Sequence, residues 1–141
     1  MLKQLSIYAE NKKGALQTMT NALYEAGINI WGSVTNDGAE YGINRMVVSD
    51  PDKAKEVLTE KGYLCRFVDV LAVEIEDKPG ALNTLLTALL DSNVNVDYTY
   101  LSFNRDSSTP VMILHTADPE EVEILPLIHI SEPTRHSLIS Y

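Results

Sequence analysis

Two short stretches of this 141-residue sequence place an Asn or Asp three positions before a glycine that is followed by alanine. A glycine at the start of a helix has no Cβ, so an anion can approach the unpaired backbone N–H groups there. An Asn or Asp side chain can accept hydrogen bonds from an ammonium group. Such a set could therefore bind a carboxylate and an ammonium group at the same turn. The residues are Asn11, Gly14 and Ala15 in the first stretch and Asp77, Gly80 and Ala81 in the second.

A further asparagine follows each stretch, Asn29 in the first case and Asn95 in the second. Each of these residues also has a purely structural explanation. Glycine is common at strand-to-helix turns, and Asn or Asp can cap a helix or bond the local backbone. For any single position the structural explanation is at least as good as a role in ligand binding. The recurrence of Asn or Asp, then Gly, then Asn in both stretches favours a ligand site.

The sequence has no pattern of residues typical of a catalytic or metal site. His115 is the one histidine in the repeated region and lies in an expected strand, where a histidine more often packs than acts as a base. Cys65 is the single cysteine, so an internal disulfide and a multi-cysteine metal site are excluded. Glycine-rich nucleotide-binding motifs and hydrolase motifs are missing. We therefore expect a protein that is not an enzyme and has no cofactor or metal.

The two stretches belong to a longer internal repeat, which must position them in the same way. Gly80 lies 66 positions after Gly14, and the residues around and after both glycines agree in order. A series of matches of this length indicates a duplicated unit. The matched segments are residues 10–18 and 76–84, residues 22–30 and 88–96, and the Asp-Pro pairs at 50–51 and 118–119.

Within each unit the hydrophobic pattern changes in the order strand, helix, strand, strand, helix, strand. Gly27 and Asn93 are expected to end the first helix of each unit in a left-handed conformation, and Asp50 to cap a helix that begins at Pro51. This order predicts fold class α+β, with two ferredoxin-like βαββαβ repeats, antiparallel sheets and helices on one face. The expected strands are residues 5–9, 28–34, 41–48, 63–68, 70–75, 94–101, 111–116 and 127–130.

Apolar residues recur at helical spacing after each of the two glycines, and we expect them on the buried face of a helix. Turns rich in Asn, Asp, Gly or Ser are expected at residues 36–38 and 104–108. The apolar helical positions are Leu16, Met19, Leu23 and Ala26 in the first unit and Leu82, Leu85, Leu86, Leu89 and Leu90 in the second.

The repeat divides the chain into a first domain at residues 1–68 and a second at residues 69–131. Pro126 should stop the last helix after about two turns, so the second domain has an irregular end. Residues 132–141 have no hydrophobic period and no counterpart in the first unit. We expect them to be a disordered tail or non-native sequence joined at about Leu125, and a native but divergent tail is the alternative.

The composition, with 45% hydrophobic and 22% charged residues, is that of a globular protein. Eleven Lys and Arg against 20 Asp and Glu give a net charge of −9, which makes nucleic acid and anionic membranes poor partners. No apolar run is long enough to span a membrane, and the first residues lack the apolar stretch of a secretory signal. The cytoplasm is therefore the expected location.

Both copies of the glycine turn resemble the ACT domain. The second copy, Asp-Lys-Pro-Gly-Ala-Leu at residues 77–82, is the closer match, because Lys13 stands where proline is usual in the first. The likeness covers residues 3 to about 125. It implies ferredoxin-like modules that bind amino acids at the interface between paired domains. Asn29 and Asn95 match positions where the family places a polar ligand contact from the paired domain.

The resemblance implies a regulatory or sensor protein that binds a free amino acid to control amino-acid metabolism. Its expected partners are that small molecule, a second copy in a homodimer, and a metabolic enzyme or transporter. The alternative is a non-catalytic regulatory small subunit of an amino-acid biosynthetic enzyme such as acetolactate synthase, in which the repeats serve mainly as an interaction surface.

Overall fold

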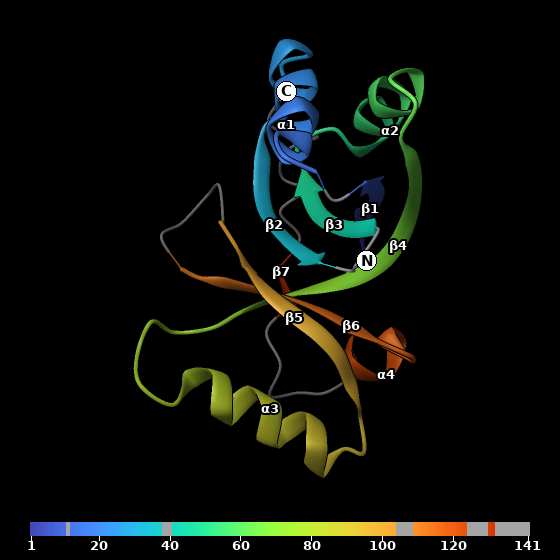
Figure 1. The fold of residues 1–141 in the computed structure, drawn as a ribbon. Helices are drawn as coiled ribbons and strands as arrows, with labels where there is room; N and C mark the ends of the chain where they lie inside the picture. The colour runs from blue at the N-terminus through green and yellow to red at the C-terminus, as the bar shows by residue number, and fades with distance from the viewer. Residues whose placement is uncertain (11, 38–40, 104–108, 124–129, 132–141) are drawn as a thin grey trace. The chain divides into compact units, whose positions relative to one another are not determined.

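The computed structural model describes residues 1–10, 12–37, 41–103, 109–123 and 130–131 (Figure 1). The chain divides into two compact units. One is Lys3–Val68, and the other begins at Asp69 and includes Met1–Leu2. None of the described helices is both long and apolar enough to cross a membrane.

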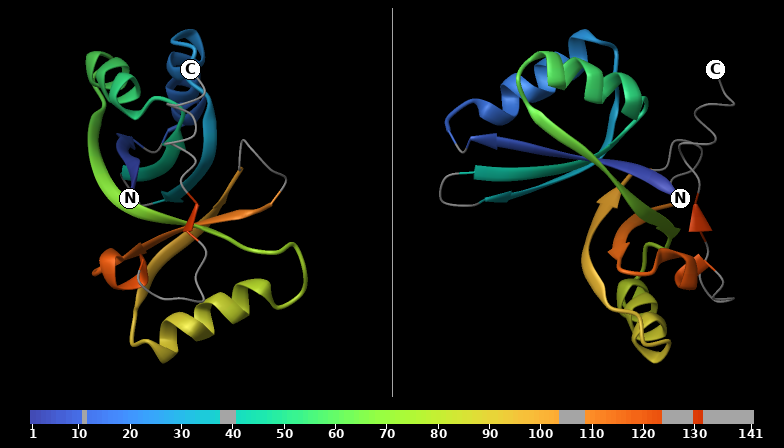
Figure 2. Two further views of the ribbon diagram at one scale, coloured as in Figure 1. Left: turned by 180° about the vertical axis from the view of Figure 1, so that it is seen from behind. Right: turned by 90° about the vertical axis from the view of Figure 1, so that its right-hand side faces the viewer.

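The first unit has the order strand, helix, strand, strand, helix, strand. Its strands lie in the order β2-β3-β1-β4, and β3 pairs antiparallel with both β1 and β2. The two helices lie side by side on one face of this sheet, as Figures 1 and 2 show. The elements are β1 (Leu2–Glu10), α1 (Ala15–Glu25), β2 (Ile30–Asp37), β3 (Tyr41–Val48), α2 (Pro51–Glu60) and the first part of β4 (Leu64–Glu74).

The second unit repeats this order, starting from the later part of β4. Strand β6 pairs antiparallel with β4 and with β5, and β7 pairs antiparallel with β4. Both units therefore have the ferredoxin-like βαββαβ fold that the sequence predicts, in the α+β class. The remaining elements are α3 (Ala81–Asp91), β5 (Val96–Ser102), β6 (Val111–Thr116), α4 (Pro119–Glu123) and β7 (Ile130–Ser131).

Each unit has a hydrophobic core between its helices and one face of its sheet. Alternate strand residues supply the sheet side, because side chains two positions apart point to the same face. In the first unit these are Leu5, Ile7, Met46 and Val48, which pack with Met19 and Leu23 of α1 and with Ala54 and Leu58 of α2. In the second unit they are Leu71, Val73, Met112 and Leu114, which pack with Leu85 and Leu89 of α3 and with Val122 of α4.

The buried face of each long helix is narrower than the sequence predicts. Leu85 and Leu89 are almost fully buried, whereas Leu90 is 75% exposed. One residue turns a helix by about 100°, so Leu86 and Leu90, each next to a buried leucine, lie to the side of the buried face. Leu16 and Leu82 lie on the same face as the buried Leu23 and Leu89 but in the first turn of their helices, where Leu16 lines an open cavity. The prediction that all apolar positions face the core is therefore wrong for Leu16, Leu82, Leu86 and Leu90, which are 48%, 38%, 36% and 75% exposed.

The residues that end and begin helices have the predicted conformations. Gly27 and Asn93, which follow α1 and α3, have φ angles of 73° and 60°. Asp50 Oδ1 accepts a hydrogen bond from the Lys53 N–H at 3.2 Å, and Pro51 is the first residue of α2. These local signals were sufficient because capping depends on neighbours in the sequence.

Two strand predictions need correction. The strands expected at residues 63–68 and 70–75 are one continuous strand, β4, and Asn36 and Asp37, expected in a turn, still pair with Ile43 and Gly42 within β2 and β3. Four predicted segments lie outside the described residues, so the structure does not test them. They are the rest of that turn, the turn at 104–108, the expected strand residues 127–129 and the tail at 132–141.

Candidate functional site

The glycine turn of the first unit connects the end of β1 with the start of α1. Gly14 is the N-cap residue with φ 83° and ψ −3°, and no described side chain caps this helix. The first helical hydrogen bond runs from the Thr18 N–H to the Gly14 carbonyl at 2.9 Å, and the Ala15 N–H donates to the Lys12 carbonyl at 3.1 Å. The N–H groups of residues 16 and 17 therefore have no acceptor within the helix and add to its positive end.

The second unit has the same turn at the start of α3. Gly80 is the N-cap residue with φ 87° and ψ −5°, again without a side-chain cap, and the Thr84 N–H donates to its carbonyl at 2.9 Å. The alternative that Asp77 is an ordinary N-cap is therefore wrong. A Cβ placed on Gly14 or Gly80 would meet no heavy atom within 4 Å, so the space in front of both turns is open.

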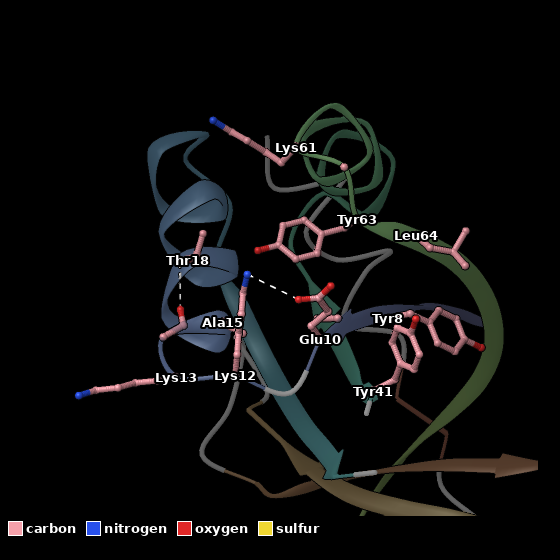
Figure 3. A pocket seen from close by; sticks show the side chains of 13 residues that line it. Tyr8, Glu10, Lys12, Lys13, Ala15, Thr18, Tyr41, Lys61, Tyr63 and Leu64 are labelled. Atoms are coloured by element: carbon pink, nitrogen blue, oxygen red, sulfur yellow. Dashed lines mark hydrogen bonds and ion pairs between the residues drawn. The ribbon is translucent and has the colours of Figure 1, made fainter. Parts of the chain in front are cut away.

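A cavity of about 530 Å³ lies against the first of these turns (Figure 3). Pockets for small molecules have volumes of about 300 to 1,000 Å³. The described residues of its walls come from the first unit: the end of β1, the turn, the start of α1, the start of β3 and the connection from α2 to β4. The lining residues are Tyr8, Ala9, Glu10, Lys12, Lys13, Gly14, Ala15, Thr18, Tyr41, Lys61, Gly62, Tyr63 and Leu64.

A smaller cavity of about 250 Å³ lies toward the other strands of the same unit. It shares Ala9, Glu10, Lys12 and Ala15 with the first cavity. Leu16, Met19, Thr35, Gly42 and Asn44 complete its lining. The turn that carries Gly14 is therefore next to two open spaces.

The charged side chains of the larger cavity are arranged loosely. Lys12 Nζ and Glu10 Oε2 are 3.7 Å apart, and the two side chains are 70% and 71% exposed. Figure 3 shows Lys12 extending along the cavity toward Tyr63, while Lys13 and Lys61 extend outward from its rim. An exposed ion pair at this distance contributes little stability, so both groups can bind another partner.

The structure places Gly14 and Ala15 at the cavity, as the sequence led us to expect, but Asn29 lines neither cavity. Asn29 is exposed, and its backbone exchanges hydrogen bonds of 2.9 Å with Ser49. Asn11 lies outside the described residues. In the second unit Gly80 and Asp77 are exposed and Ala81 is half-buried.

Polar groups of the second unit bond to neighbours in the sequence. At the second turn Lys78 Nζ lies 2.8 Å from Glu76 Oε2, and beyond the other end of α3 Asn95 Nδ2 donates to Asp97 Oδ1 at 3.1 Å. The hydrogen bond from Lys78 and its positive charge lower the pKa of the Glu76 carboxyl. Lys78 is therefore held more closely by its acidic neighbour than Lys12 is.

Sequence reasoning missed the tyrosines and Lys61 in the cavity wall. Tyr8 lies on β1 and Tyr41 on β3, and the pairing of Glu10 with Tyr41 brings the two together. Lys61 and Tyr63 reach the same end of the unit because Gly62, with φ 92°, reverses the chain after α2. A glycine that follows a helix is a local signal in the sequence, whereas the strand register that completes the wall is not.

Two other groups of chemical interest lie away from this cavity. His115 Nδ1 is 2.8 Å from Asp97 Oδ2, and the His115 ring stacks on Tyr98 with centroids 4.9 Å apart. Cys65 belongs to the core of the first unit, and burial raises the pKa of its thiol. Among the described residues no cluster of three or more His, Cys, Asp or Glu side chains could hold a metal ion.

The repeated turn and the repeated fold agree with a comparison of the sequence with family models. Residues 1–131 match the model described as an ACT domain pair. The chain belongs to this family. A comparison with curated proteins gives no match.

Solved structures with the same fold include one with appreciable sequence identity. A protein from Bacteroides thetaiotaomicron is 29% identical, with a TM-score of 0.84 over 94% of this chain and 93% of that one. The ligand-free regulatory subunit of aspartate kinase from Thermus thermophilus is 14% identical, with a TM-score of 0.63 over 98% and 91%. The corresponding subunit from Thermus flavus is 16% identical, with a TM-score of 0.58 over 98% and 94%.

Proposed function

We propose that this protein binds a free amino acid at its glycine turns and regulates amino-acid metabolism through that binding, without catalysing a reaction. One observation carries the proposal: the same uncapped, left-handed glycine starts the first helix of both units, with open space in front of it. Unpaired N–H groups at a helix start favour a carboxylate. The proposed ligand contacts at the turns are Asn11, Gly14, Ala15, Asp77, Gly80 and Ala81. Asn29 and Asn95 would contribute from a paired domain.

The first turn is the stronger candidate of the two, because a cavity of ligand size lies against it. There the carboxylate would bind the N–H groups after Gly14, and the ammonium would lie near the Glu10 carboxylate. In the second turn the exposed Asp77 is the acceptor for the ammonium group.

Family membership and the structural neighbours support a regulatory role. The subunits from both Thermus species are described as regulatory subunits of an enzyme, and this chain matches over 90% of the length of each. We propose that this protein works as a cytoplasmic homodimer that docks on an enzyme or transporter. The ligand can shift the docking equilibrium only as far as its affinity for the docked protein differs from its affinity for the undocked protein.

The proposal is tested by isothermal titration calorimetry of the purified chain with each of the twenty amino acids. Binding of at least one of them is expected, and no heat with any would contradict the proposal. If the second turn also binds, Asp77→Ala should weaken that site by about tenfold to a hundredfold, since a charge-assisted hydrogen bond is lost. Wild-type stoichiometry and affinity in Asp77→Ala would assign the ligand to the first turn alone.

A further inference from the structure

The cavity of the first unit concentrates positive charge in an acidic protein. Among the described residues that line it there are three lysines and one acid, a formal charge of +2, while the whole chain has −9. The cations are Lys12, Lys13 and Lys61, and the acid is Glu10. Lys12 extends along the cavity, and Lys13 and Lys61 stand at its rim (Figure 3). Charges of one sign gathered around a concave site raise the local concentration of ligands with the opposite charge.

Neutral hydrogen-bonding groups surround the same space. Tyr8, Tyr41 and Tyr63 line the cavity, and Figure 3 shows Tyr63 with its ring directed toward the space between α1 and β1. A phenol can donate a hydrogen bond to a carboxylate oxygen. Together with the N–H groups that follow Gly14, the described part of the cavity has donors for more than one anionic group and one carboxylate, Glu10, for an ammonium.

The second unit lacks this arrangement at the matching positions. Sixty-six positions after Tyr8 and Lys13 stand Glu74 and Pro79. Lys78, the counterpart of Lys12, lies 2.8 Å from Glu76, compared with 3.7 Å for Lys12 and Glu10. The two repeats share one fold, so their turns differ mainly in the charge around them. An anionic ligand should therefore prefer the first turn.

We infer that the first unit selects an amino acid with a second anionic group, such as glutamate or aspartate. This inference rests on the proposed function and specifies its ligand class. The α-carboxylate binds the N–H groups after Gly14, and the ammonium lies near Glu10. The second carboxylate lies near Lys12, within the field of Lys13 and Lys61.

Calorimetric titrations of the full chain with L-glutamate, L-aspartate and their amides test this inference, because each acid and its amide have nearly the same size. The Kd of each acid is expected to be lower than that of its amide by about tenfold or more. The reason is that the neutral amide cannot form the charge-assisted hydrogen bond that the carboxylate forms. This advantage should fall when the salt concentration rises from 0.05 M to 0.5 M, since exposed charges are then screened over about a few ångströms.

Matched variants assign the preference to the first unit. Lys12→Gln combined with Lys61→Gln should remove most of the difference between glutamate and glutamine, and both lysines are exposed and lie outside the core. Lys78→Gln changes the counterpart of Lys12 in the second unit and should preserve the difference.

Three outcomes overturn the inference in distinguishable ways. Equal affinity of the wild type for glutamate and glutamine, or tight binding of a neutral amino acid alone, overturns it and leaves the proposed function standing. Loss of the preference in Lys78→Gln but not in the double variant moves the selective site to the second unit. No binding of any amino acid overturns both proposals.

Discussion

Gly14 and Gly80 have nearly the same backbone conformation, but only one of them lies at the larger cavity. Their φ angles are 83° and 87°, a region that residues with a Cβ adopt at a cost of about 1 to 2 kcal/mol. Neither position crowds an added Cβ. Any difference between matched substitutions at the two glycines therefore comes from the ligand and not from packing.

We predict that Gly14→Ala and Gly80→Ala each lower the free energy of unfolding by about 1 to 2 kcal/mol. The reason is that alanine adopts this left-handed conformation only with strain, whereas glycine adopts it freely. Only Gly14→Ala should weaken the binding of the preferred amino acid, because its methyl group lies on the path to the helix N–H groups. Urea denaturation and calorimetry measure the two effects. Equal loss of affinity in both variants would argue for two equivalent sites.

Cys65 offers a separate test at the residue scale. Burial raises the pKa of its thiol, and this outweighs a hydrogen bond from Thr59 and the charge of Lys55, which lower it. A raised pKa leaves less thiolate at neutral pH, and the thiolate is the reactive form. Alkylation of the native protein by iodoacetamide at pH 7.5 should be much slower than alkylation in urea. Equal rates would show that the thiol is accessible in the native protein.

In α3 the hydrophobic pattern predicts that a helix forms, but it does not predict which of its leucines are buried. The pattern predicted the helix, but Leu90 is mostly exposed although it is as apolar as its neighbour Leu89. How wide a face a helix buries depends on the elements that it packs against, and those contacts are non-local. In α1, Met19 is buried but Leu16, one turn earlier on the same face, is 48% exposed, because the first turn of this helix borders an open cavity.

We predict that Leu89→Ala lowers the free energy of unfolding by about 2 to 5 kcal/mol, because it leaves a cavity in the core of the second unit. Leu90→Ala should change it by about 0.5 kcal/mol or less, since this side chain is 75% exposed. Urea denaturation of the two variants gives the comparison. A large loss in Leu90→Ala would mean that this leucine is covered in solution, for example by another copy of the chain.

The candidate site was predictable only where it depends on local sequence. Gly14 and its role at the start of α1 follow from the turn and the helical pattern. Strand β3 has the predicted bounds, Tyr41–Val48, because turn residues precede it and the Asp50-Pro51 helix start follows it. Tyr8 and Lys61 could not be assigned to the same cavity, since strand register and the end of α2 bring them together from distant parts of the sequence.

At the scale of the whole molecule, duplication has produced two units with one fold and different charge around the same turn. Each unit has its own hydrophobic core, so each can respond separately to a ligand. The larger cavity belongs entirely to the first unit. A ligand bound there should therefore stabilise the first unit more than the second.

We predict that glutamate at 100 times its Kd stabilises the first unit by about 2.7 kcal/mol, because it binds the folded and not the unfolded chain. For a unit of this size the unfolding temperature should rise by about 10 °C or more. Differential scanning calorimetry of Leu89→Ala measures this, since the weakened second unit should unfold first and separate the two transitions. Only the upper transition should move with glutamate, and glutamine at the same concentration is the control. A shift confined to the lower transition would place the ligand in the second unit, at the turn that carries Gly80.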